Sequence, residues 1–127
     1  MSKNLMTCLI PKLNASVIIM KEKYKIDFEK VANVNGRISF YADSHMTENP
    51  ELARHLTCSG KEITEMQIDD LEIALRGLPI QEDWGEVGGS LLYIHQSEGN
   101  VEVGYSNKKI PIQDFKQLLE EWLLFIS

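Results

Sequence analysis

The adjacent side chains of Asp43, Ser44 and His45 are the residue types of a serine-hydrolase triad. A triad needs an acid, a base and a nucleophile that converge from separate places in the fold. Adjacent residues cannot converge in this way, and the chain contains no G-x-S-x-G nucleophile elbow. We therefore expect these three residues to form a loop that follows a strand.

The residues closest to a metal-ligand pattern are His45, His55 and Cys58. Zinc usually takes four ligands in tighter, paired spacings, and a fourth ligand here would have to be Asp43 or Cys8. The spacing of the two cysteines is not a metal signature. We expect no metal ion and no cofactor, and we expect Cys8 and Cys58 to be free, buried thiols.

Two further patterns argue against an enzyme. Gly85, Gly88 and Gly89 resemble a phosphate-binding loop, but G-x-x-x-x-G-K-[ST] is absent and the loop carries acidic residues that repel phosphate. Asp69 and Asp70 are adjacent, so on a helix they point apart and cannot act as a converging acid/base pair. The sequence therefore predicts a protein without catalytic residues.

An acidic stripe is expected on a helix over residues 64–76. At about 100° per residue, Glu65, Asp69 and Glu72 share one side of that helix, and Met66 and Ile73 fall beside them. Like charges one turn apart destabilise a helix by about 0.2–0.5 kcal/mol per pair. The stripe suits contact with a basic partner that has an apolar surface. An ordinary solvated helix face explains it as well.

A tryptophan among carboxylates forms the second candidate contact site. Trp84 lies between Glu82, Asp83 and Glu86 in a segment expected to be a loop. Tryptophan is frequent among the residues that dominate binding energy at protein interfaces. The alternative is that Trp84 folds back into the core, and the sequence leaves both possibilities open.

The chain end is the most clearly predicted element. After Pro111, apolar residues recur with helical spacing, which predicts an amphipathic, buried C-terminal helix. Leu123 and Leu124 should widen its apolar side. The recurring positions are Phe115, Leu118, Leu119, Trp122, Phe125 and Ile126.

A second helix is predicted over residues 64–76. Thr64 and Gln67 have the spacing of a capping box, and Gly77 stands where a C′ glycine terminates a helix. Its core side is expected to consist of Ile68, Leu71, Ala74, Leu75 and Leu78.

The remaining segments predict mainly strands. A hairpin over 91–96 and 101–105 turns at 97–100, and a short strand over 109–112 follows. His95, in the first strand of this hairpin, should be half-buried or on the surface. Strands are also expected at 16–20 and 38–42, and a short helix at 50–57, whereas 26–34 fits a strand or a helix. Together these elements predict one α+β domain over 1–127, mostly antiparallel sheet with helices packed on it.

Composition narrows the classes of partner. The net charge is −6, with 19 acidic and 13 basic residues. This charge argues against nucleic acid and against anionic membrane surfaces, which attract basic proteins. It fits a basic protein partner, and it also fits simple solubility. No apolar run approaches a membrane span and no secretory signal is evident, so a cytoplasmic protein is expected.

The C-terminal third resembles a known family. A strand pair followed by IPIQDFKQLLEEWLLFI is similar to small immunity proteins of bacterial polymorphic toxin systems, in particular those of contact-dependent growth inhibition. The resemblance implies a cytoplasmic protein that binds a basic toxin domain, often a nuclease, and blocks its active site or substrate groove. The alternative is a scaffold or adaptor subunit of a phage or secretion system.

Overall fold

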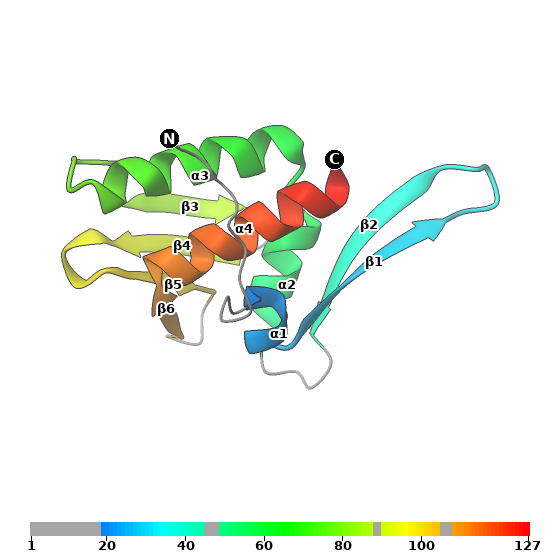
Figure 1. Cartoon of the computed structure of the whole chain (residues 1–127), viewed down its shortest axis with the longest axis horizontal. Helices are drawn as coiled ribbons and strands as arrows, with labels where there is room; N and C mark the ends of the chain where they lie inside the picture. Colours follow the sequence, from blue (N-terminus) through cyan, green and yellow to red (C-terminus); the bar gives the residue numbers. More distant parts are fainter. Residues whose placement is uncertain (1–18, 45–48, 88–89, 105–107) are drawn as a thin grey trace, which may run out of the picture.

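The computed structural model describes residues 19–44, 49–87, 90–104 and 108–127. A four-stranded antiparallel sheet packs against helices, and a two-stranded antiparallel sheet projects from them as an arm (Figure 1). The fold is therefore α+β, as the sequence predicts. The elements of the described chain are α1 (Met20–Lys23), β1 (Ile26–Ala32), β2 (Ile38–Ser44), α2 (Pro50–Thr57), α3 (Lys61–Leu75), β3 (Asp83–Val87), β4 (Ser90–His95), η1 (Gln96–Glu98), β5 (Asn100–Val103), β6 (Lys109–Pro111) and α4 (Ile112–Ile126).

The four-stranded sheet has the order β3-β4-β5-β6. The predicted hairpin is confirmed as β4 and β5, and the short third strand is confirmed as β6. Side chains alternate between the two faces of a strand, so one face of this sheet is apolar and buried and the other carries Tyr93, His95 and Glu102. The buried residues are Leu92, Ile94, Val101, Val103 and Ile110.

Helix α4 packs against α3 and against the buried side of the sheet. The predicted core positions Phe115, Leu118, Leu119 and Trp122 are at most 1% exposed. The expectation for Leu124 is wrong, because its side chain is 81% exposed. Leu124 is nine residues after Phe115, which places it about 180° around the helix, on the side that faces water.

The start of α3 differs from the prediction. The helix begins at Lys61, with Gly60 at the N-cap position, so the capping box of Thr64 and Gln67 does not exist. The Thr64 hydroxyl instead donates to the carbonyl of Gly60 (2.8 Å), one turn back. Gln67 is buried and its amide contacts His55.

The end of α3 is only partly as predicted. Gly77 has a φ of 81° and terminates the helix, as expected. Leu75 and Leu78, however, are 43% and 50% exposed, so their assignment to the core is wrong. Leu75 lies in the last helical turn, and Leu78 follows the turn at Gly77. The core ends before them.

The first half of the chain forms the arm. Residues 26–34, which fitted a strand or a helix, contain β1, and β2 pairs with it in register from Ile26 opposite Ser44 to Ala32 opposite Ile38. Asp43 and Ser44 belong to β2, so the predicted loop is wrong there. The predicted helix at 50–57 is confirmed as α2. Residues 16–18 and His45 lie outside the described residues, and Met20 begins α1, not a strand.

Candidate partner-binding surface

The acidic row on α3 is exposed to solvent. Glu65 and Asp69 stand one helical turn apart, and neither forms an ion pair with any described residue. Glu72 differs, because Lys116 Nζ on α4 lies 3.6 Å from its carboxylate. Lys116 is closer to Glu120, at 2.8 Å. The uncompensated negative charge of the row is therefore concentrated at Glu65 and Asp69.

Apolar side chains lie beside this row. Met66 is 57% exposed and Ile63 is 38% exposed, although both belong to a helix packed on the core. Ile73 is half-buried. Met66 is about 60° around the helix from Asp69, on the side that faces β3. Helix α3 thus presents the acidic row beside an apolar strip, which consists of Ile63, Met66 and Ile73.

A groove of about 360 Å³ follows the apolar strip between α3 and β3. Its walls come from two successive elements, α3 and β3, and from the segment that joins them, and its polar groups are carboxylates and amides. The lining residues are Ile63, Met66, Gln67, Asp70, Gln81, Asp83 and Trp84. Such a groove can accept an apolar side chain with a positively charged end.

The sequence left open whether Trp84 is a surface contact residue or a core residue, and its burial in the structure is intermediate. Its ring is half-buried against the core, yet it also forms part of the groove wall. The indole Nε1 donates to the carbonyl of Gln81 (2.9 Å). Because this bond holds the indole N–H, the ring can offer a partner its apolar surface.

Of the three carboxylates near Trp84, only that of Asp83 lines the groove with it. The segment is mainly strand β3 and not a loop, and its pairing with β4 shifts between Asp83 and Gly85. Glu82 accepts the backbone N–H of Gln96 (2.9 Å), and Asp83 accepts that of Gly85 (2.9 Å). Glu86 pairs with Leu91, whose side chain lies on the open face of the sheet.

Of the residues that resemble a metal-ligand pattern, the structure describes His55 and Cys58, and these differ in burial. His55 is fully buried, with Nε2 2.9 Å from Gln67 Oε1 and its ring 5.8 Å from that of Phe115. Cys58 is exposed, so the expectation of a buried thiol is wrong. It follows the last residue of α2. Cys8 and His45 lie outside the described residues, which hold no group of three metal-ligating side chains.

One cluster escaped the sequence analysis. On the open face of the sheet, His95 Nε2 lies 2.8 Å from Glu102 Oε1, and the His95 ring lies 4.7 Å from that of Tyr93. These residues line a depression of about 330 Å³. The signal was available, because residues 93 and 95 share one face of a strand. The facing position 102 could be assigned only once the register was known.

Comparison with known proteins identifies no relative: the chain matches no family model, no curated protein and no solved structure. Within the described ranges, no helix combines the length and the apolar character needed to cross a membrane.

Proposed function

We propose that this protein acts by binding a basic protein partner and not by catalysing a reaction. The observation that carries the proposal is the uncompensated pair Glu65 and Asp69 beside the exposed side chain of Met66. In the free chain this arrangement is unfavourable twice, because like charges repel across one turn and an apolar side chain stays in water. A basic partner with an apolar centre removes both costs.

The surrounding geometry supports this partner. The net charge of −6 provides a long-range field that accelerates association with a positively charged molecule. The groove between α3 and β3 provides a recess for one anchoring side chain, with Trp84 as its apolar wall. Interfaces gain most of their affinity from a few such anchors. Glu65, Asp69 and Glu72 are the charge contacts, and Met66, Ile73 and Trp84 are the apolar contacts.

The particular function that we propose is that of an immunity protein. It neutralises a cognate toxin domain, a nuclease, in the cytoplasm of the cell that produces the toxin. Nucleases carry basic grooves because they bind phosphate backbones. An acidic surface can occupy such a groove in place of the substrate and so block the active site.

The experiment is co-expression with basic nuclease toxin domains, chosen from proteins whose genes neighbour the gene for this chain. We expect a tight 1:1 complex, rescue of growth, and a Kd that rises steeply with salt. Reversing two charges together, Glu65→Lys with Asp69→Lys, should slow association and weaken binding by at least about tenfold, which is about 1.4 kcal/mol.

A matched control separates local contact from net charge. Glu22→Lys with Glu98→Lys changes the total charge equally at two exposed positions outside α3, so it should weaken binding much less. Equal losses of affinity in both double variants would contradict the assignment of the site to α3. Absence of any complex and of growth rescue would contradict the proposed immunity function.

A scaffold or adaptor subunit is the second candidate function. The projecting arm favours it, because exposed apolar side chains on a two-stranded sheet suit assembly. Sedimentation over a wide concentration range distinguishes the two candidates. A scaffold self-associates or binds several partners, whereas an immunity protein remains monomeric until it meets one partner.

A further inference from the structure

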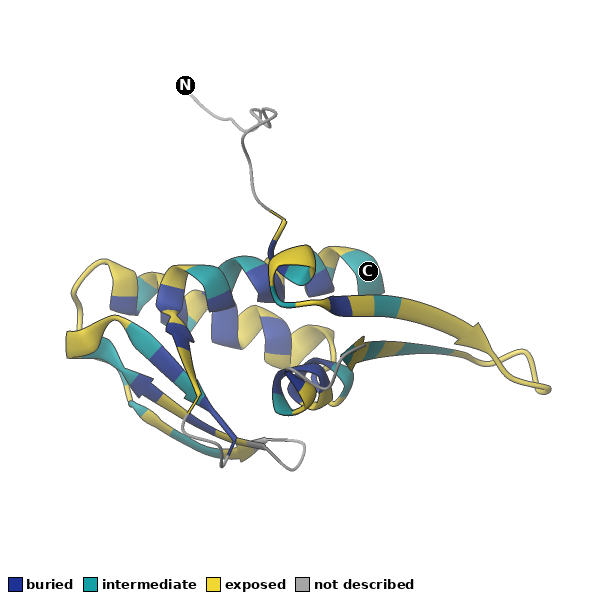
Figure 2. Cartoon of the chain, turned by 90° about the horizontal axis from the view of Figure 1, so that it is seen from below, coloured by how far each residue is buried: buried dark blue, intermediate teal, exposed yellow. Residues whose placement is uncertain are grey.

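The arm, formed by β1 and β2, packs against the body at its root and is exposed to solvent farther out. Ile26 is 2% exposed, and the Phe28 ring lies 5.1 Å from that of Trp122 and 5.4 Å from that of Phe125. Farther out, Val31 and Ile38 are 45% and 48% exposed. Figure 2 shows this change from buried to exposed along the projecting strands.

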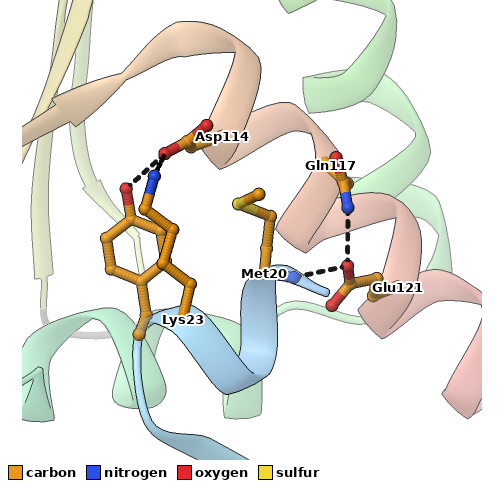
Figure 3. Close-up of polar contacts among 6 residues, drawn as sticks. Met20, Lys23, Asp114, Gln117 and Glu121 are labelled. Atoms are coloured by element: carbon orange, nitrogen blue, oxygen red, sulfur yellow. Dashed lines mark hydrogen bonds and ion pairs between the residues drawn. The ribbon is translucent and has the colours of Figure 1, made fainter. Parts of the chain in front are cut away.

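Helix α1 fastens that root to α4. The carboxylate of Glu121 accepts the backbone N–H groups of Met20 (2.8 Å) and Lys21 (2.9 Å), which the first turn of a helix leaves without intrahelical partners. Asp114 accepts hydrogen bonds from Tyr24 and Lys23 (Figure 3). The arm therefore starts from a rigid base.

The hydrogen-bond phase of the arm determines which backbone groups point outward. In an antiparallel pair, facing residues alternate between hydrogen-bonded and non-hydrogen-bonded pairs. Asn33 N–H donates to the Arg37 carbonyl (2.9 Å), so these two residues form a hydrogen-bonded pair. The next pair along the register, Ala32 and Ile38, is therefore non-hydrogen-bonded, and so is every second pair after it. The N–H and C=O groups of Ile38 and Phe40 therefore point away from β1, along the outer edge of β2.

The hydrogen bonds of Thr57 are consistent with this alternation, because they reach backbone groups of β2 that point away from β1. Its hydroxyl accepts the N–H of Ala42 (2.9 Å) and donates to the Ala42 carbonyl (3.1 Å). A single side chain thus takes the position that a third strand would occupy at Ala42. No strand in the described part of the chain pairs with the edge farther out, at Phe40 and Ile38.

A groove of about 460 Å³ lies along this open edge. It is bounded on one side by β2 and on the other by the junction between α2 and α3 and the end of α4. Its lining is largely apolar or uncharged: Ile38, Ser39, Phe40, Tyr41, Thr57, Ser59, Gly60, Lys61, Trp122 and Ile126.

The two faces of the arm differ in charge. Phe40 lies on the face that packs towards Phe125. The opposite face carries exposed Asp27, Glu29 and Asp43, and Asp27 stands directly opposite Asp43 in the register. A basic side chain on this face would be attracted by the exposed carboxylates of Glu29 and Asp43.

We infer that the outer edge of β2 at Ile38 and Phe40 accepts an extended segment of a partner protein as an added strand. Backbone hydrogen bonds hold the segment, and its side chains alternate between apolar residues in the groove and basic residues over the acidic face. This inference goes beyond the proposed function, since it concerns a different surface and does not depend on α3. A second copy fits less well, because two-fold pairing of β2 edges would place two acidic faces side by side.

The test begins with hydrogen exchange on the full chain at two concentrations. The amides of Ile38 and Phe40 should exchange rapidly at both. Protection at both concentrations would assign the edge to a segment of this chain, and protection only at the higher one would assign it to a second copy. Either result overturns the inference.

The next step is selection from a displayed library of random linear peptides on the full chain. We expect binders in which apolar and basic residues alternate, and about tenfold or greater slowing of exchange at the Ile38 and Phe40 amides on binding. No binders, acidic binders, or protection confined to other residues would overturn the inference.

A pair of proline variants separates the two edges of the arm. Ile38→Pro removes the outward donor on β2, and Ala32→Pro removes the facing one on β1, with no ladder hydrogen bond lost in either case. We expect at least about tenfold weaker peptide binding for Ile38→Pro and unchanged binding for Ala32→Pro. Equal binding by both variants would contradict the assignment.

Peptide chemistry repeats the test without changing the protein. Methylation of alternate backbone nitrogens of a selected peptide removes the donors on one of its edges. One set of alternate nitrogens should abolish binding and the other should leave it intact. Equal effects of the two sets would show that the peptide does not bind as a strand.

Discussion

The Tyr24 hydroxyl donates a 2.7 Å hydrogen bond to Asp114 Oδ2, the same oxygen that lies 2.8 Å from Lys23 Nζ. Burial by itself would raise the pKa of Asp114, but the hydrogen bonds from Lys23 and Tyr24 outweigh it and lower the pKa below its usual value. Burial and the nearby Asp114 carboxylate raise the pKa of Tyr24. The hydroxyl therefore remains a donor throughout the neutral range.

Asp114→Asn should destabilise the protein by about 1–2 kcal/mol at pH 7, because hydrogen bonds to a charged group are lost. A lowered carboxyl pKa contributes stability above the unfolded-state pKa, and this contribution disappears as the pH falls through the folded-state value. The difference from the native chain should therefore narrow from pH 7 to pH 3. Urea unfolding at both pH values measures it, with exposed Glu22→Gln as the control. A difference that grows on acidification would contradict this account.

Gln67→Ala should cost about 2–3 kcal/mol of unfolding free energy, since it leaves the Nε2 of fully buried His55 without its amide partner and opens a small cavity. Gln113→Ala, at an exposed position of α4, should change stability by less than about 0.5 kcal/mol. Thermal and urea unfolding compare the two variants. Similar values for both would show that the contact between His55 and Gln67 contributes little.

Asp69→Lys should stabilise the free protein even though it weakens partner binding. The change removes a like-charge pair with Glu65 and creates an opposite-charge pair at the same spacing, for a gain of about 0.4–1.0 kcal/mol. Asp69→Asn should give only the smaller, first part of this gain. Both gains should shrink at high salt, and urea unfolding at two salt concentrations checks this. Loss of stability in Asp69→Lys would mean that the carboxylate has a structural role.

Phe125→Ala should loosen the arm from the body. Its ring lies 5.4 Å from that of Phe28 and 5.6 Å from that of Phe40, so its removal should cost about 2–3 kcal/mol. Hydrogen exchange should accelerate in β1 and β2 more than in β4 and β5. Leu124→Ala, at a position that is 81% exposed, should leave both sheets unchanged. Uniform acceleration throughout the molecule would show that the arm and the body unfold as one unit.

Local patterns in the sequence predicted much of the body. The helical spacing that ends at Ile126, the glycine after α3, and the alternation in β4 and β5 are short-range features, and each element formed where its pattern lay. Patterns of this kind specify which side chains share a face because helices and strands have fixed periods. They also correctly placed Glu65, Asp69 and Met66 on the exposed side of α3.

The tertiary structure alone decided which groups meet. Gln67 had the spacing of a helix cap and instead contacts His55, and Glu82 had the appearance of a free surface charge and instead holds a backbone N–H of Gln96. Thr57, from a separate helix, occupies the edge of β2 at Ala42, and no described strand pairs with that edge at Ile38 and Phe40. A period fixes the direction of a side chain relative to its own backbone, whereas its partner depends on long-range packing between elements that the period does not encode.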